Sequence, residues 1–236
     1  MIKGVIFDLD DTLYDYKSAN DVAMVELFAY AAQRLDISVD AFKTAFHEGR
    51  KTTKQILTDT AAIHSRTLYC QHALEYLGVN PFTYTVEFSS YFWNCFLSCI
   101  SLHAGVIELL QLLKSRSIKV AICTDMTTEV QHLKLQKLGL VDYVDHIITS
   151  EEVGVEKPHP KMFDETLKKM RISTSEVIMV GDSYKKDVLG ALSVGIKPFW
   201  FTNGEAPIHD VPSTLSIITK FEDLIQNEEF LSQLSN

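Results

Sequence analysis

Cysteines and long apolar runs are scarce in this sequence. Only four of the 236 residues are cysteine, and they form neither a CxxC pair nor the spacing of a secreted disulfide framework. No segment approaches the roughly 18 consecutive apolar residues of a membrane span. The apolar start of the chain meets Asp8 before a signal peptide could develop. We therefore expect a soluble, cytoplasmic protein with reduced thiols.

Basic residues are in the minority as well. Lysine and arginine total 22 against 31 aspartates and glutamates, which gives a formal net charge of −9 at pH 7. A chain of this charge repels a phosphate backbone unless its basic residues are clustered. We therefore expect neither a nucleic acid polymer nor a membrane as a partner, and the sequence leaves the oligomeric state open.

The composition that remains is that of a globular protein, with 46% hydrophobic and 22% charged residues. Short apolar runs recur along it, at Ile2–Leu9, Lys119–Cys123, His146–Thr149, Val177–Val180 and Lys197–Phe201. Amphipathic stretches lie between several of them, at Val106–Arg116, Glu129–Leu138 and Pro160–Met170. Strands that alternate with helices predict an α/β fold with a doubly wound, Rossmann-like parallel sheet and helices on both of its faces.

One long segment departs from this pattern. Between residues 16 and 101 the apolar residues follow helical spacing, and strand-like runs are missing. We predict an α/β catalytic core formed by residues 1–15 and 102–236, with a smaller helical cap domain inserted at residues 16–101. The insert follows directly on the first apolar run, so we expect core and cap to share a cleft.

Carboxylates stand where the predicted strands end. In open parallel sheets, ligands bind outside the carboxyl ends of the strands, so polar groups from distant segments meet at one edge. Asp8 and Asp10 are two residues apart, a spacing that places both on one side of a strand if the strand continues that far. Such a pair is costly unless a cation compensates its charge, which favours Mg²⁺. Asp182, at the end of another strand, supplies a third carboxylate.

Two further side chains complete a candidate phosphoryl-transfer site. Thr124 ends a predicted strand and offers a hydroxyl group, and Lys157 offers a compact positive charge for phosphate. Each residue also has a structural alternative: Asp10 as a turn residue, Thr124 as a β-branched strand residue and Lys157 as a solvated loop lysine. Asp182 could cap the next helix, which is compatible with metal binding.

Four short motifs occur in order along the chain. They are DxDxT at Asp8–Thr12, a strand-end threonine at Thr124 in ICTD, a lysine at Lys157 in EEVGVEKPHPKMF and GDxxxxD at Gly181–Asp187. In order, separation and surrounding sequence they resemble the haloacid dehalogenase-like hydrolase superfamily, in the branch with a helical cap after the first motif. The resemblance covers the whole core.

This resemblance implies a Mg²⁺-dependent phosphatase that hydrolyses a small phosphomonoester. Asp8 would attack phosphorus and form an aspartyl-phosphate. Asp10 would protonate the leaving oxygen and then accept a proton from the attacking water. The metal ligands would be the Asp8 side chain, the backbone carbonyl of Asp10 and Asp182.

The resemblance also implies how the phosphate is held. Thr124, the backbone amide near Asp125 and Lys157 would bind the phosphoryl oxygens. Asp187 would orient either Lys157 or a metal-bound water, and Thr12 would brace the turn. These roles follow from the positions of the residues in the motifs.

The leaving group is open, because in this architecture the cap chooses it. Nucleotides, sugar phosphates and phosphoglycolate all remain candidates, and we expect Tyr16, Arg50, Lys54 and Trp93 of the cap to contribute to the choice. The alternatives to a phosphatase are a haloacid dehalogenase, a phosphomutase and a non-catalytic phospho-switch module. A dehalogenase needs neither a metal nor a second acid, so Asp10 and Asp182 argue against it.

Overall fold

The computed structural model describes residues 1–58, 60–204, 211–212 and 215–234. The chain forms two compact units, one made of Met1–Asp15 with Ser101–Asn236 and the other of Tyr16–Ile100. We refer to them as the α/β unit and the helical unit, and describe each by itself.

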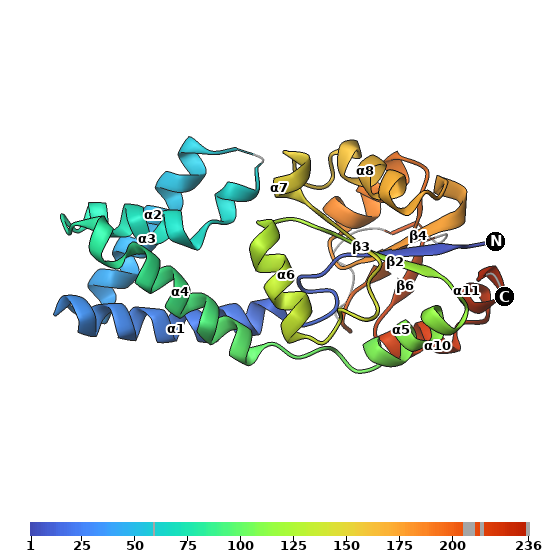
Figure 1. Ribbon diagram of the computed structural model, residues 1–236, viewed down its shortest axis with the longest axis horizontal. Coiled ribbons are helices and arrows are strands. Elements are labelled where there is room, and N and C mark those ends of the chain that lie inside the picture. The colour runs from blue at the N-terminus through green and yellow to red at the C-terminus, as the bar shows by residue number, and fades with distance from the viewer. Residues whose placement is uncertain (59, 205–210, 213–214, 235–236) are drawn as a thin grey trace. The chain divides into compact units, whose positions relative to one another are not determined.

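A six-stranded, all-parallel sheet forms the centre of the α/β unit, in the order β3-β2-β1-β4-β5-β6 (Figure 1). The strands are β1 (Gly4–Phe7), β2 (Lys119–Thr124), β3 (His146–Thr149), β4 (Val177–Gly181), β5 (Lys197–Phe201) and β6 (Ser216–Ile218). The predicted doubly wound α/β class is therefore confirmed.

Helices cover both faces of this sheet. They are α5 (Val106–Ser115), α6 (Thr128–Lys137), α7 (Ser150–Val153), α8 (Pro160–Met170), η2 (Thr174–Glu176), the π-helical turn η3 (Tyr184–Val188), α9 (Leu189–Ser193), α10 (Phe221–Gln226) and α11 (Glu228–Gln233). Helices α5 and α10 pack together on one face, and α8 and α9 lie on the other (Figure 1). The site therefore sits on a sheet that is anchored from both sides.

Side chains of strand β5 pack against helices on both faces of the sheet. Alternate side chains of a strand point to opposite sides of the sheet. Phe201 packs on Phe221 of α10, with ring centroids 4.8 Å apart. Trp200 instead packs on Tyr184 of η3, at 5.0 Å, and its indole Nε1 donates a 2.7 Å hydrogen bond to the backbone oxygen of Asp182. The sheet thereby holds the chain that follows β4.

The helical unit has an aromatic core of its own. Its helices are α1 (Tyr16–Leu35), α2 (Val39–Ile56), η1 (Ala61–His64), α3 (Arg66–Tyr76) and α4 (Pro81–Cys99). Phe28 of α1 packs edge-on against Phe42 and Phe46 of α2, and Phe42 packs edge-on against Phe88 of α4. Edge-to-face pairs of this kind contribute about 0.5–1.5 kcal/mol each beyond the area they bury.

Two of the residues predicted to select a substrate have structural contacts within the helical unit. The buried Arg66 donates a hydrogen bond from Nη2 to the hydroxyl of Tyr16 at 2.5 Å, and its guanidinium lies 5.3 Å from the ring centroid of Trp93. Arg50 and Lys54 are exposed on α2. Tyr16 and Trp93 therefore help to hold a buried arginine, and the proposed contribution of all four residues to specificity stays a prediction.

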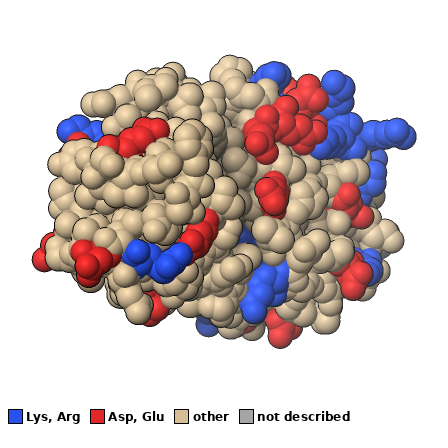
Figure 2. All heavy atoms as spheres, turned by 60° about the vertical axis from the view of Figure 1, so that its left-hand side comes forward, with Lys and Arg blue, Asp and Glu red and all other residues tan. Residues whose placement is uncertain are grey.

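On the face of the molecule seen in Figure 2, Lys and Arg gather at the upper right, next to a group of Asp and Glu. Among the residues described, every helix is too short or too polar to span a membrane.

Candidate active site

The three central strands bring the motif residues to one edge of the sheet. Strand β1 pairs in parallel with β2 on one side and with β4 on the other. Asp8 directly follows β1, Thr124 is the last residue of β2, and Asp182 directly follows β4. Because the carboxyl ends of parallel strands lie side by side, three segments far apart in the sequence meet here.

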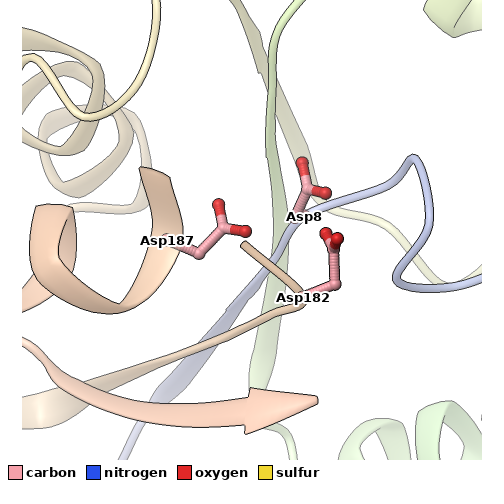
Figure 3. Close-up of side chains that lie close together, drawn as sticks. All are labelled: Asp8, Asp182 and Asp187. Atoms are coloured by element: carbon pink, nitrogen blue, oxygen red, sulfur yellow. The ribbon is translucent and has the colours of Figure 1, made fainter. Parts of the chain in front are cut away.

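Asp8, Asp182 and Asp187 form a cluster of carboxylates. One carboxylate oxygen from each lies within 4.8 Å of the others, and Figure 3 shows the three groups converging. Burial raises the pKa of Asp8 well above its usual value, and Asp187 and Asp182 raise it further. Burial, followed by the charge of Asp187, raises the pKa of Asp182 to about 7. The cluster therefore carries more negative charge than its protein surroundings compensate.

Lys157 is the ammonium group of this cluster. Its Nζ donates to Asp8 Oδ1 and to Asp187 Oδ1, both at 2.6 Å, and its side chain is only 2% exposed. Burial by itself would lower the pKa of Lys157, but the charges of Asp187 and Asp8 hold it well above the usual value. The lysine is therefore a charged, buried group, and the solvated-loop alternative is wrong.

Both carboxylate oxygens of Asp187 accept hydrogen bonds from the protein. Oδ1 accepts from Lys157, and Oδ2 accepts from the backbone N–H of Ser183 at 2.9 Å. A Cβ atom at Gly181 would lie 2.5 Å from the carboxyl carbon of Asp187, so only glycine permits this approach. The geometry favours the orientation of Lys157 over a metal-bound water as the task of Asp187.

Thr12 links the first motif to the fourth. Its hydroxyl lies 3.2 Å from Asp8 Oδ2 and from Asp182 Oδ1, and it accepts a 3.0 Å hydrogen bond from the backbone N–H of Asp182. The backbone before it turns at Asp11, which has a φ of 61°. This left-handed residue redirects the chain, so that Thr12 can reach back to both carboxylates.

Thr124 and Asp125 belong to a polar network at the end of β2. The buried hydroxyl of Thr124 accepts a 2.5 Å hydrogen bond from Gln131 Nε2. Asp125 accepts from the backbone N–H of Lys157 at 3.0 Å and from Nζ of Lys186 at 2.7 Å. Asp125 therefore ties the segment that carries Lys157 to the end of β2.

The carboxylate of Asp10 has partners different from those of Asp8. Lys134 Nζ donates to both of its oxygens, at 2.7 and 2.8 Å, and the Tyr14 hydroxyl donates to Oδ1 at 2.5 Å. Strand β1 ends at Phe7, so strand alternation does not extend to Asp10. A metal contact from Asp10 thus stays a proposal that concerns its backbone carbonyl.

Gln131 and Lys134 are polar site residues that were not predicted. Both lie on α6 and are fully buried, and Leu135 beside them is buried as well. The sequence predicted an amphipathic helix here, whereas its buried face is largely polar. A signal was present, because positions 131, 134, 135 and 138 have the spacing of one helix face. Two polar residues on the same face as Leu135 and Leu138 indicate buried partners.

The cluster suits a divalent cation by its chemistry. Mg²⁺ prefers hard oxygen ligands, and carboxylates are its usual ones in proteins. Asp8 and Asp182 have raised pKa values because one lysine does not balance three carboxylates. Added positive charge would lower both pKa values and favour the ionised carboxylates that act as ligands. Asp8 and Asp182 would hold the cation.

Known proteins share sequence with this chain over most of its length. A family model described as haloacid dehalogenase-like hydrolase matches residues 2–195. The chain is 36% identical over 207 residues to a ribulose-1,5-bisphosphate 5-phosphatase of Halopiger xanaduensis, covering 87% of each chain. It is 33% identical over 204 residues to a glyceraldehyde 3-phosphate phosphatase of Pyrococcus furiosus, covering 86% of this chain and 82% of the relative. It is 29% identical over 230 residues to a pyrimidine 5′-nucleotidase of Escherichia coli, covering 94% and 96%.

Solved structures show the same fold. A 2-haloacid dehalogenase of Pseudomonas syringae superposes with a TM-score of 0.76 at 24% identity, over 99% of both chains. A HAD phosphatase from Thermococcus onnurineus superposes with a TM-score of 0.71 at 24% identity, over 95% of this chain and 97% of the other. At this level of identity the likeness concerns the fold.

The pKa of Asp182 predicts how metal-free protein responds to pH. Its pKa rises from 3.8 to about 7 on folding. The protonated form therefore favours the folded state, and this contribution is present below about pH 4 and is lost as the pH rises toward 7. In EDTA, the wild type should lose more thermal stability between about pH 5 and about pH 8 than Asp182→Asn, and Mg²⁺ should reduce the loss. Equal pH slopes for the two proteins would contradict the assignment.

Proposed function

The chain belongs to the haloacid dehalogenase-like hydrolases and acts on phosphoric monoesters, and we propose that it is a Mg²⁺-dependent phosphatase for small phosphorylated sugars. The observation that carries the proposal is the buried Asp8, held by Lys157 beside Asp182 at the carboxyl edge of the sheet. A nucleophilic carboxylate, a fixed ammonium group and an oxygen site for a cation are the parts that phosphoryl transfer requires.

In the first step a carboxylate oxygen of Asp8 forms a bond to phosphorus, and the bond from phosphorus to the leaving oxygen breaks. Asp10 gives a proton to that oxygen, so that an alcohol departs. In the second step a water oxygen attacks the aspartyl-phosphate while Asp10 accepts a proton from it. The bond between Asp8 and phosphorus breaks, which releases inorganic phosphate and restores the free carboxylate.

The phosphoryl group needs donors during both displacements. An ammonium group has three N–H donors, and Lys157 directs two of them to Asp8 and Asp187. The third would donate to a phosphoryl oxygen, together with the backbone amide near Asp125 and the hydroxyl of Thr124, which would turn away from the backbone oxygen of Asp125. When bound at Asp8, Asp182 and the backbone carbonyl of Asp10, Mg²⁺ would supply the charge that lets two anions approach.

The relatives support the class of substrate. The two most similar proteins described above act, by their names, on a ketose bisphosphate and on a triose phosphate. The nucleotidase of Escherichia coli supports a nucleoside monophosphate as the second candidate. A haloacid dehalogenase or a phosphomutase would share the nucleophile, and a phospho-switch would share the acidic pocket. Release of inorganic phosphate distinguishes the hydrolase from all three.

The nucleophile can be tested with Asp8→Asn. The amide has the shape of the carboxylate but cannot form the aspartyl-phosphate, so hydrolysis of p-nitrophenyl phosphate should fall by several orders of magnitude. Acid-quenched wild type should carry one phosphoryl group by mass spectrometry, and the variant none. Asp142→Asn, which changes an exposed carboxylate of the same unit, is the matched control. Substantial turnover by Asp8→Asn would contradict the role of Asp8.

The metal can be tested by chelation. EDTA should abolish phosphate release, and Mg²⁺ should restore it better than Ca²⁺, whose larger and looser coordination shell misplaces nucleophile and phosphate. Asp182→Ala should lose activity that added Mg²⁺ does not restore. Undiminished turnover in EDTA would overturn the metal requirement and favour dehalogenase chemistry, for which chloride release from 2-chloropropionate is the assay.

The substrate class can be tested with a panel of monoesters. We expect higher kcat/KM for ketose and triose phosphates than for nucleoside monophosphates, with p-nitrophenyl phosphate as the reference ester. Contacts that distinguish two leaving groups contribute about 1–3 kcal/mol, or roughly 10–200-fold. A clear preference for pyrimidine nucleotides would replace the sugar phosphate with the second candidate and leave the chemistry unchanged.

A further inference from the structure

Lys134 is a lysine whose burial needs an explanation. It lies on α6, and its side chain is 0% exposed. Lysine is almost never fully buried unless it is paired, because removing an ammonium group from water costs several kcal/mol. Its partner in the described structure is the carboxylate of Asp10, which lies 124 residues earlier in the sequence.

The geometry of this pair fixes the orientation of a carboxylate. Lys134 Nζ contacts both oxygens of Asp10, at 2.7 and 2.8 Å, and a single donor placed between two oxygens restricts rotation of the group. The Tyr14 hydroxyl donates to Oδ1 at 2.5 Å, and Gln131 Nε2 lies 3.4 Å from Oδ2. The Asp10 side chain nonetheless remains 19% exposed, so the group is held from behind while part of it faces solvent.

The same helix face also contacts the phosphate-binding segment. Gln131 Nε2 donates to the hydroxyl of Thr124 at 2.5 Å and to the backbone oxygen of Asp125 at 2.8 Å. One turn of α6 thus fixes the proton-transfer carboxylate and the end of β2 relative to each other. Proton transfer and phosphoryl transfer depend on such mutual placement, because small displacements of reacting groups reduce rates strongly.

We infer that Lys134 is a positioning residue, which holds the Asp10 carboxylate in line with the leaving oxygen. This inference rests on the proposed phosphatase function and adds a residue of α6 to it. The alternative is a merely structural pair that ties α6 to the loop after β1. The two readings differ in what happens to esters whose leaving groups do, or do not, need a proton.

Leaving groups of different basicity provide the test. The parameter kcat/KM reports the steps up to departure of the leaving group. Dinitrophenolate departs without a proton, whereas the alkoxide of glycerol 2-phosphate needs one. Positioned proton transfer contributes typically 10²–10⁴-fold. With Lys134→Met we expect kcat/KM for glycerol 2-phosphate to fall by about 10²-fold, at the low end of that range, and the value for 2,4-dinitrophenyl phosphate to change little.

Three further proteins make the result specific. Lys137→Met changes an exposed lysine on the same helix and should leave both esters unaffected. In the double variant Asp10→Asn with Lys134→Met, glycerol 2-phosphate should be hydrolysed no more slowly than by Asp10→Asn alone, because the group to be positioned is already lost. Lys134→Gln retains N–H donors without the charge and should show a smaller selective loss. Thermal unfolding of each protein shows whether it is folded.

The outcomes distinguish a failure of the positioning role from a failure of the phosphatase function. Equal losses for both esters, or no loss for either, would overturn the positioning role while leaving the phosphatase function intact. If Lys134→Met alone does not fold, the selective loss must appear in Lys134→Gln, and its absence there has the same meaning. Wild type that releases phosphate from neither ester would overturn the proposed function, and the inference with it.

Discussion

The geometry of the site depends on a buried salt-bridge network, in which the ammonium group of Lys157 lies between the carboxylates of Asp8 and Asp187. Both contacts are 2.6 Å long, and all three side chains are almost completely buried. Burying a single charge costs several kcal/mol, and breaking a buried pair costs about 3–5 kcal/mol. Loss of Lys157 would therefore leave uncompensated negative charge at the centre of the fold. The lysine also balances only part of the negative charge, which is why Asp182 gains protons more readily and why a cation fits.

The surroundings of this salt-bridge network restrict its geometry. Gly181 lacks a side chain where Asp187 approaches, and Trp200 binds the backbone oxygen of Asp182 from the neighbouring strand. Thr12 contacts Asp8 and Asp182 together. Asp8 and Asp182 directly follow strands β1 and β4, and helices cover both faces of the sheet. The chemistry is thus placed on side chains that several hydrogen bonds and close contacts hold.

Two aspartates that are two residues apart have separate environments. Asp8 is almost completely buried and shares Lys157 with Asp187, whereas Asp10 is partly exposed and pairs with Lys134. Different surroundings allow neighbouring carboxylates to perform different tasks. We propose nucleophilic attack for Asp8 and proton transfer for Asp10.

The sequence by itself determined the class of fold and the set of motif residues. Strands buried on both faces must be continuously apolar, so β3 and β5 were predicted with the bounds that the structure shows, and β1, β2 and β4 to within two residues. Only β6, three residues long with a single buried side chain, gave no such signal. Motif residues at strand ends followed from the rule that parallel strands end at one edge.

Tertiary structure decided which partner each carboxylate has. The end of β1 at Phe7 and the left-handed turn at Asp11 separate Asp10 from Asp8, which strand alternation could not anticipate. The burial of Lys134 likewise depends on a carboxylate 124 residues away in the sequence. Local sequence patterns indicate which residues of a helix or strand are apolar, because these residues are close together in the sequence. The pairing of buried charges depends instead on how segments far apart in the sequence pack together. The local sequence around each residue does not indicate which distant residue will be its partner.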